Sequence, residues 1–141
     1  MSALPAFTPT DRATVFSTLW TAMWNGELPA AKIVSPDCAV YFGRTPVVER
    51  PTVTHGPDAL QRVVDEIRGR LPGARYGFDS QPLHHAEGAD GGVITLLWFI
   101  DIPGRGDRSG IDLLRYRDRA ITEVWTLTGD LKLPHMPLSR G

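Results

Sequence analysis

The sequence predicts a single α+β domain in which helices cover one face of a curved antiparallel sheet. Its 141 residues match the size of one ordinary domain. Hydrophobic residues make up 42% and charged residues 22%, a balance typical of a globular protein. The expected elements run in the order helix, short helix, strand pair, helix and four strands, with no internal repeat between them.

The first helix is expected to begin at Thr8, as N-cap, and Pro9, at the first helical position, and to end at Asn25-Gly26. Its apolar residues recur at helical spacing, namely Phe16, Leu19, Trp20 and Met23. Pro29 then begins a short second helix. Residues 38–42 form the first strand, and a loop leads into a second strand that ends at Gly56.

Pro57 begins the third helix, and Pro72-Gly73 ends it. This segment is amphipathic, because one face carries Leu60, Val63, Val64, Ile67 and Leu71. The rest of the chain is expected to form strands over residues 74–86, 93–102, 108–117 and 120–128. Turn-forming sequences separate them, as in EGADGG and PGRGDR.

Composition excludes several classes of function. The net charge is −1 with no basic stripe, so no nucleic-acid partner is expected. No apolar run approaches the ~20 residues of a membrane span, and the N-terminus lacks signal-peptide features. Cys38 is the single cysteine, so no intramolecular disulfide forms. We expect a cytoplasmic protein with one domain over residues 1–141, of which 1–8 and 132–141 are extended tails.

Four phrases carry a resemblance to a known family: WNGEL, PDCAVYF, HGPDALQRV and IDLLRYRDRAITEVW. In this order they resemble the nuclear transport factor 2-like (NTF2-like) superfamily, in its SnoaL-like polyketide cyclase and ketosteroid isomerase branch. The resemblance implies a cystatin-like cone, whose curved sheet and N-terminal helices enclose an apolar pocket, and a homodimer. It also implies acid–base chemistry on a hydrophobic small molecule.

Asp112 is the first candidate for that chemistry. Alternate residues of a strand share a face, so Asp112 lies with Leu114 and Tyr116 in an otherwise apolar run. A carboxyl group that faces an apolar cavity is desolvated, and its pKa rises. The alternative is an edge position or an ion pair with Arg115 or Arg108. The resemblance supports the cavity, because the superfamily places a pocket carboxyl group in this strand.

Three further residues are candidate acid–base partners: Glu123, His55 and Tyr41. The strand register that the resemblance implies turns the face with Glu123 toward the pocket. Two carboxyl groups in one apolar pocket would shift each other's pKa values apart, which gives one acid and one base. The alternative is a surface glutamate paired with an arginine. His55 would shuttle protons at neutral pH or hydrogen-bond at a helix start. Tyr41 faces the pocket only if the strand register slips by one residue.

Two branches of the superfamily fit less well. Ketosteroid isomerases carry a proton-abstracting aspartate in the first strand, where this chain has Phe42. Limonene-epoxide hydrolases carry an Arg-x-Asp sequence that would fall on Phe99-Ile100-Asp101, which lacks the arginine. Both activities are therefore disfavoured.

An aromatic and apolar lining is expected to bind the substrate, contributed by Phe16, Trp20, Trp24, Phe42, Phe99, Leu114, Tyr116 and Trp125. No metal or cofactor is expected, because His84 and His85 are adjacent in a strand and point to opposite sides. We therefore expect a cofactor-independent enzyme that cyclises, isomerises or dehydrates a carbonyl compound, such as a polyketide or terpenoid intermediate. The alternative is a non-catalytic module that binds a hydrophobic ligand or dimerises.

Overall fold

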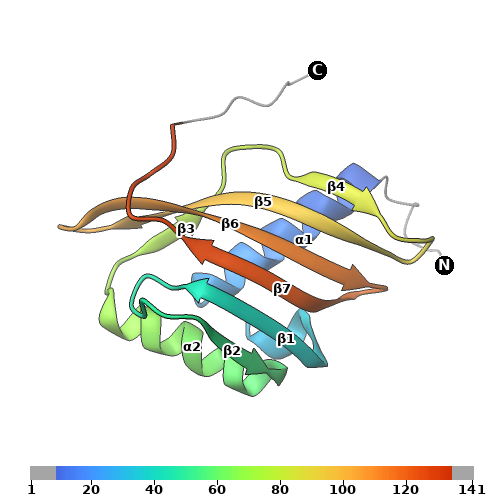
Figure 1. Ribbon diagram of the computed structural model, residues 1–141, viewed down its shortest axis with the longest axis horizontal. Coiled ribbons are helices and arrows are strands. Elements are labelled where there is room, and N and C mark those ends of the chain that lie inside the picture. The colour runs from blue at the N-terminus through green and yellow to red at the C-terminus, as the bar shows by residue number, and fades with distance from the viewer. Residues whose placement is uncertain (1–8, 135–141) are drawn as a thin grey trace.

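The computed structural model describes residues 9–134, and these form two layers, a curved sheet and the helices behind it (Figure 1). The helical elements are α1 (Pro9–Trp24), the 3-10 turn η1 (Ala30–Lys32) and α2 (Gly56–Arg70). The strands are β1 (Val34–Arg44), β2 (Thr52–His55), β3 (Arg75–Gly77), β4 (Leu83–Ala86), β5 (Gly91–Ile102), β6 (Gly106–Arg117) and β7 (Ala120–Thr128). The predicted N-cap Thr8 and most of the two predicted tails lie outside the described residues.

The strands form one sheet in the order β2-β1-β7-β6-β5-β3, with β4 also paired to β5. Most pairings are antiparallel, as predicted, but β1 and β7 run parallel. This parallel pair places the first and the last strand of the chain side by side in the sheet. The expected order of helices and strands is confirmed, except that five strands and not four follow α2, and the sheet is mixed rather than purely antiparallel.

The segment predicted as one strand over residues 74–86 is two short strands. β3 pairs with Phe99–Asp101 and β4 with Gly92–Thr95, at opposite ends of β5. Pro82 lies in the break between them and has no backbone N–H to donate to a ladder. The short second helix is likewise reduced to η1, since the chain enters β1 at Val34.

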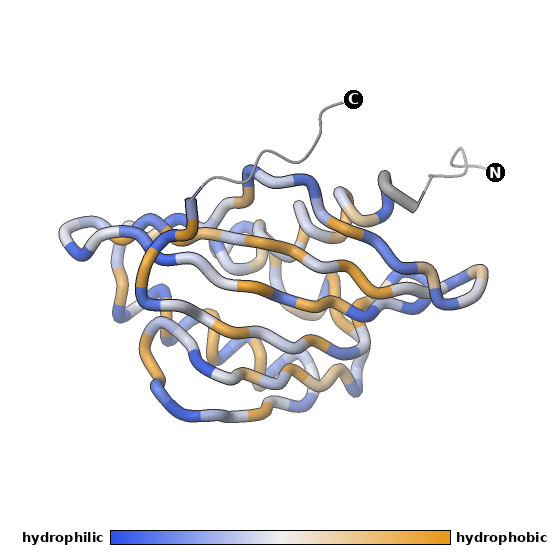
Figure 2. The backbone as a smooth tube through the Cα atoms, turned by 45° about the horizontal axis from the view of Figure 1, so that its top comes forward, coloured by the Kyte–Doolittle hydropathy of each residue, from blue (hydrophilic) through white to orange (hydrophobic). Residues whose placement is uncertain are grey.

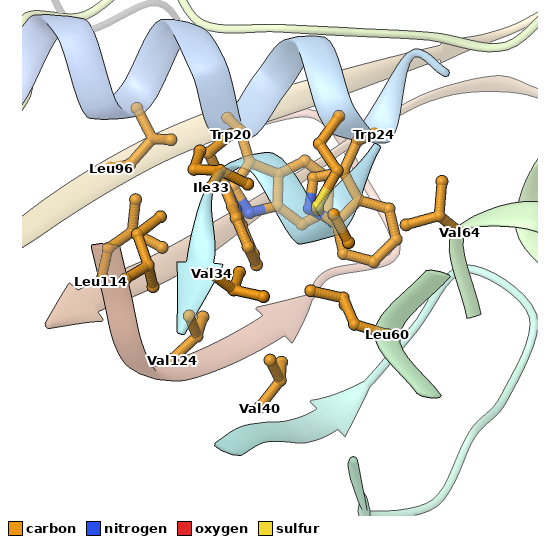
Figure 3. Packing of buried hydrophobic residues seen from close by; sticks show 14 of the residues in the cluster. Trp20, Trp24, Ile33, Val34, Val40, Leu60, Val64, Leu96, Leu114 and Val124 are labelled. Atoms are coloured by element: carbon orange, nitrogen blue, oxygen red, sulfur yellow. The ribbon is translucent and has the colours of Figure 1, made fainter. Parts of the chain in front are cut away.

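The core lies between the helices and the face of the sheet that they cover, here called the inner face. α2 is amphipathic as predicted and buries Leu60, Val64 and Ile67. Trp20 and Trp24 extend from α1 toward the strands (Figure 3). Burial of large apolar side chains of this kind contributes about 1.5–3 kcal/mol for each residue.

Side chains alternate between the two faces of each long strand. In β6, Asp112, Leu114 and Tyr116 are buried on the inner face, whereas Ile111 and Leu113 are about 40% exposed on the other, outer face. Figure 2 shows how hydrophobic and hydrophilic stretches follow one another along the strands. In the described part of the chain, no helix is long and apolar enough to cross a membrane.

Candidate functional site

Asp112 lies on the inner face, where three neutral donors contact its carboxylate. Trp20 Nε1 donates a hydrogen bond to Oδ2 at 2.7 Å, and Trp98 Nε1 donates one to Oδ1 at 2.8 Å. The hydroxyl group of Thr126 also donates to this carboxylate. The aspartate is 3% exposed, so these contacts replace nearly all of its hydration.

Burial governs the ionisation of this carboxyl group. Desolvation raises the pKa of Asp112 to about 6, and the hydrogen bonds from Thr126, Trp20 and Trp98 oppose the rise. The group is therefore mostly ionised at pH 7 and protonated in mild acid. A carboxyl group with a pKa of this kind can accept and return a proton near neutral pH.

The sheet register positions the three donors. Thr126 lies directly opposite Asp112 on the neighbouring strand, so their side chains share the inner face. Trp98 lies opposite Gly110, and a Cβ atom at Gly110 would collide with its indole ring. Glycine at this position therefore lets the Trp98 ring pass over β6 and reach Asp112.

A cavity opens next to Asp112. Its aromatic lining consists of Trp20, Trp24, Phe42, Tyr76 and Trp98, and its polar lining of Thr21, Arg44, Thr45, Asp112, Thr126 and Thr128. Pro46, Ile67 and Leu96 complete the lining. The free space, measured for the centre of a water molecule, is about 20 Å³, enough for one compact group.

The structure places Glu123 on the outer face, so the expectation that it faces the same cavity as Asp112 is wrong. Its carboxylate pairs with Arg115 at 2.8 Å, which agrees with the alternative prediction of a surface glutamate paired with an arginine. Trp125 and Tyr41 lie on the outer face with it and stack at 5.6 Å between ring centroids. The register between β1 and β7 does not slip here, so Phe42 and not Tyr41 faces inward.

His55 and Phe99 also lie away from the cavity. His55 is exposed at the N-cap of α2, forms no side-chain cap, and pairs with Ala39 of β1. Phe99 is half-buried and covers Gly77, with Lys132 Nζ 4.4 Å from its ring centroid. Neither residue can contact a ligand held beside Asp112. Phe99 lies on the outer face of β5, and His55 lies at the end of β2.

Three predicted binding residues are buried in the core but do not belong to the cavity lining: Phe16, Leu114 and Tyr116. Phe16 stacks on Tyr116 at 4.7 Å, and the Tyr116 hydroxyl lies 2.7 Å from His84 Nε2. Of the eight predicted binding residues, the cavity lining therefore contains Trp20, Trp24 and Phe42.

Sequence reasoning did not identify Tyr76 and Thr126. Thr126 lies on the face of β7 opposite Glu123, so the prediction that the Glu123 face points inward placed Thr126 outside the pocket. Tyr76 had no signal beyond its place in a predicted strand. Burial and the nearby Asp112 carboxylate raise the pKa of the Tyr76 phenol well above its usual value, so the phenol stays protonated.

The structure adds neither a reactive thiol nor a metal-binding cluster to the site within the described residues. Burial raises the pKa of the Cys38 thiol to about 12, which makes it a poor nucleophile. Among residues 9–134, no cluster of histidine, cysteine and carboxylate side chains is arranged to hold a metal ion.

No protein-family model matches the chain, and no curated protein matches it in sequence. Solved structures do match. A protein assigned as a SnoaL-like isomerase from Agrobacterium tumefaciens has a TM-score of 0.67 and 14% identity, covering 84% of this chain and 97% of that one. An NTF2-like protein of unknown function from Mesorhizobium loti has a TM-score of 0.62 and 14% identity, covering 90% and 98%. The chain has the NTF2-like fold.

The NTF2-like fold does not determine the activity. A third match, assigned as a calcium/calmodulin-dependent protein kinase II association domain from Xanthomonas campestris, has a TM-score of 0.68. It is 12% identical and covers 91% of this chain and 93% of that one. Isomerase-like and association domains thus share this architecture, and the site must decide between them.

Proposed function

We propose that the protein is a cofactor-independent acid–base enzyme that transfers a proton next to the carbonyl group of a small molecule. One observation carries the proposal: a buried carboxyl group with a pKa of about 6 lines the cavity next to an aromatic wall. Strongly perturbed carboxyl groups in clefts are typical of functional sites. The SnoaL-like match supports the same class of chemistry.

The proposed step uses two side chains. The Asp112 carboxylate removes a proton from the carbon next to the carbonyl group, and the electrons of the broken C–H bond form an enolate. The Tyr76 phenol, which lines the same cavity, donates a hydrogen bond to the enolate oxygen. Asp112 then returns the proton to the same carbon or to a different one, which gives exchange or isomerisation.

Asp112 would act alone as the base. Glu123, Tyr41 and His55 lie outside the cavity, so none of them can supply a second proton-transfer group to this ligand. The small free volume favours a compact substrate, or the compact head of a larger one. The size of the cavity therefore limits how much of a polyketide or terpenoid substrate, the class that the resemblance implies, can lie beside Asp112.

Hydrogen–deuterium exchange of ketones tests the proposal. Butanone, cyclopentanone and acetophenone are incubated with the protein in D₂O, and loss of the α-proton signal is followed by NMR. The wild type should accelerate exchange of at least one ketone, and Asp112→Asn should lower that rate 10²–10⁴-fold. Glu123→Gln, a carboxyl group of the outer face, should stay within twofold. Equal rates for the wild type and Asp112→Asn would exclude the proposed base.

The second candidate is an association module, and the outer face favours it. Six large apolar side chains are between 36% and 56% exposed there, on β1, β2, β6 and β7: Tyr41, Val53, Ile111, Leu113, Trp125 and Leu127. They line a shallow hollow of about 690 Å³. Apolar patches of this kind mark interaction sites. We infer that two copies of the chain associate through this face, whether or not the inner cavity is catalytic.

A further inference from the structure

The charge of Asp112 has no counter-charge in the protein. Trp20, Trp98 and Thr126 supply hydrogen bonds, but all three donors are neutral. Within the described residues, no lysine, arginine or histidine forms an ion pair with Asp112. Buried carboxylates are usually paired with a cation or a metal ion, because an isolated charge is costly in an apolar environment. The Asp112 carboxylate therefore has three hydrogen-bond donors but no paired cation among the described residues.

The rings around the cavity favour the same charge. Trp24 lies 5.6 Å from Tyr76 and 6.3 Å from Phe42, and Tyr76 lies 5.4 Å from Trp98, all between ring centroids. They form a continuous aromatic wall. The face of an aromatic ring carries negative potential, so a wall of this kind attracts a cation.

The positive charge of Arg44, which lines the cavity, is paired with two carboxylates. Arg44 pairs with Glu49 at 2.8 Å and with Asp130 at 2.6 Å, so this group of three carries a net charge of −1. Arg68 lies close enough to Tyr76 to affect its pKa, but its side chain is exposed and screened by solvent. Among the described residues that line the cavity, Arg44 is the one cation and Asp112 the one carboxylate, and the charge of Arg44 is already paired with Glu49 and Asp130.

We propose that the cavity binds a compact organic cation, such as a methylated ammonium group, held between Asp112 and the aromatic wall. The free space of about 20 Å³ for a water centre limits the ligand to a compact group. The inference concerns the same cavity as the proposed function, and a cation held there would compete with the ketone for the place beside Asp112. Binding itself does not depend on turnover.

Choline and its neutral isostere 3,3-dimethylbutan-1-ol test the proposal, since they differ only in nitrogen against carbon at the head group. Binding is measured by calorimetry on the full chain at pH 7.5. Choline should bind at least tenfold more tightly than the alcohol. Asp112→Asn should reduce choline affinity to that of the alcohol, and Glu123→Gln should leave the ratio unchanged. Equal affinities for choline and the alcohol in the wild type, or no binding of choline, would overturn the proposal.

A second measurement does not depend on the folding of Asp112→Asn. The carboxyl carbon of Asp112 is titrated by NMR in the wild type with and without each ligand. Choline should lower its pKa, because a bound cation favours the carboxylate, whereas the alcohol should raise it or leave it unchanged. A pKa that choline does not lower would count against the proposal. Choline binding without ketone exchange would exclude the proposed enzyme and support the cation site. Ketone exchange without choline binding would exclude the cation site alone.

Discussion

Trp20 and Asp112 are 92 residues apart in the chain and are joined by a hydrogen bond of 2.7 Å between the indole N–H and the carboxylate. This bond ties the first helix to the sixth strand across the core. With the matching bond from Trp98, it holds the carboxylate in one orientation beside the cavity. Stability and the proposed chemistry therefore depend on the same contacts, and both can be measured.

The first prediction concerns stability and pH. The pKa of Asp112 is about 6 in the folded state, against an ordinary value of 3.8 for aspartate, so the folded protein binds more protons between these two pH values. Stability should therefore fall as pH rises through this window, by about 2 kcal/mol between pH 4.5 and 7.5 for this group alone. Urea unfolding of the wild type and Asp112→Asn at both pH values measures the difference. A variant with the wild-type pH dependence would contradict the raised pKa.

The second prediction concerns the indole donors. Trp98→Phe keeps a ring in place but removes the N–H that lowers the pKa of Asp112. The pKa should rise above about 6, and the protein should lose about 1.5–3 kcal/mol of stability at pH 7.5, the usual contribution of a hydrogen bond to a charged group. Carbon NMR titration and urea unfolding measure the two effects.

Trp24→Phe is the matched control for that prediction. Trp24 lines the same cavity, but its indole is not among the donors to Asp112. The pKa of Asp112 should stay the same in this variant, even though its smaller ring leaves space in the core. A similar rise in both variants would mean that ring packing, and not the N–H group, governs the carboxyl group.

The third prediction concerns Gly110. A Cβ atom there would overlap the Trp98 ring and approach the backbone oxygen of Leu127 at 2.6 Å. Gly110→Ala should displace the Trp98 indole, reduce stability by about 1–3 kcal/mol and raise the pKa of Asp112. Gly69→Ala in α2 is the control, because nothing lies within 4 Å of its added Cβ, and it should stabilise the helix by about 0.5–1 kcal/mol. Thermal unfolding that ranks the two variants in the opposite order would contradict this explanation.

The fourth prediction concerns association. Leu127 and Val53 are 56% and 48% exposed on the outer face, so charges placed there leave the core intact. Leu127→Asp and Val53→Asp should convert a dimer into a monomer, because two like charges would face each other across the interface. Light scattering after gel filtration measures the mass. Leu131→Asp is the control, since Leu131 is 79% exposed and lies outside the hollow. A wild type that is monomeric at all concentrations would contradict the dimer.

The sequence by itself determined the order of the elements and much of what each one buries. The proline and glycine residues around α2 and its apolar spacing predicted both its limits and its buried face. The alternation in β6 grouped Asp112 with Leu114 and Tyr116, and the structure buries all three. These features are local, so the residues that determine them lie within a few positions of one another.

Only the tertiary structure decided which face of β7 points inward. Alternation separates Glu123 and Trp125 from Val124 and Thr126, but both sets contain apolar residues, so periodicity cannot tell the core from an exposed apolar face. The parallel register between β1 and β7 and the packing of α2 against β1 settle this choice. The donors to Asp112 come from α1, β5 and β7, and no local pattern in the sequence relates those segments. The site is therefore a property of the assembled sheet and helix, because its contacts span 14 to 92 residues of the chain.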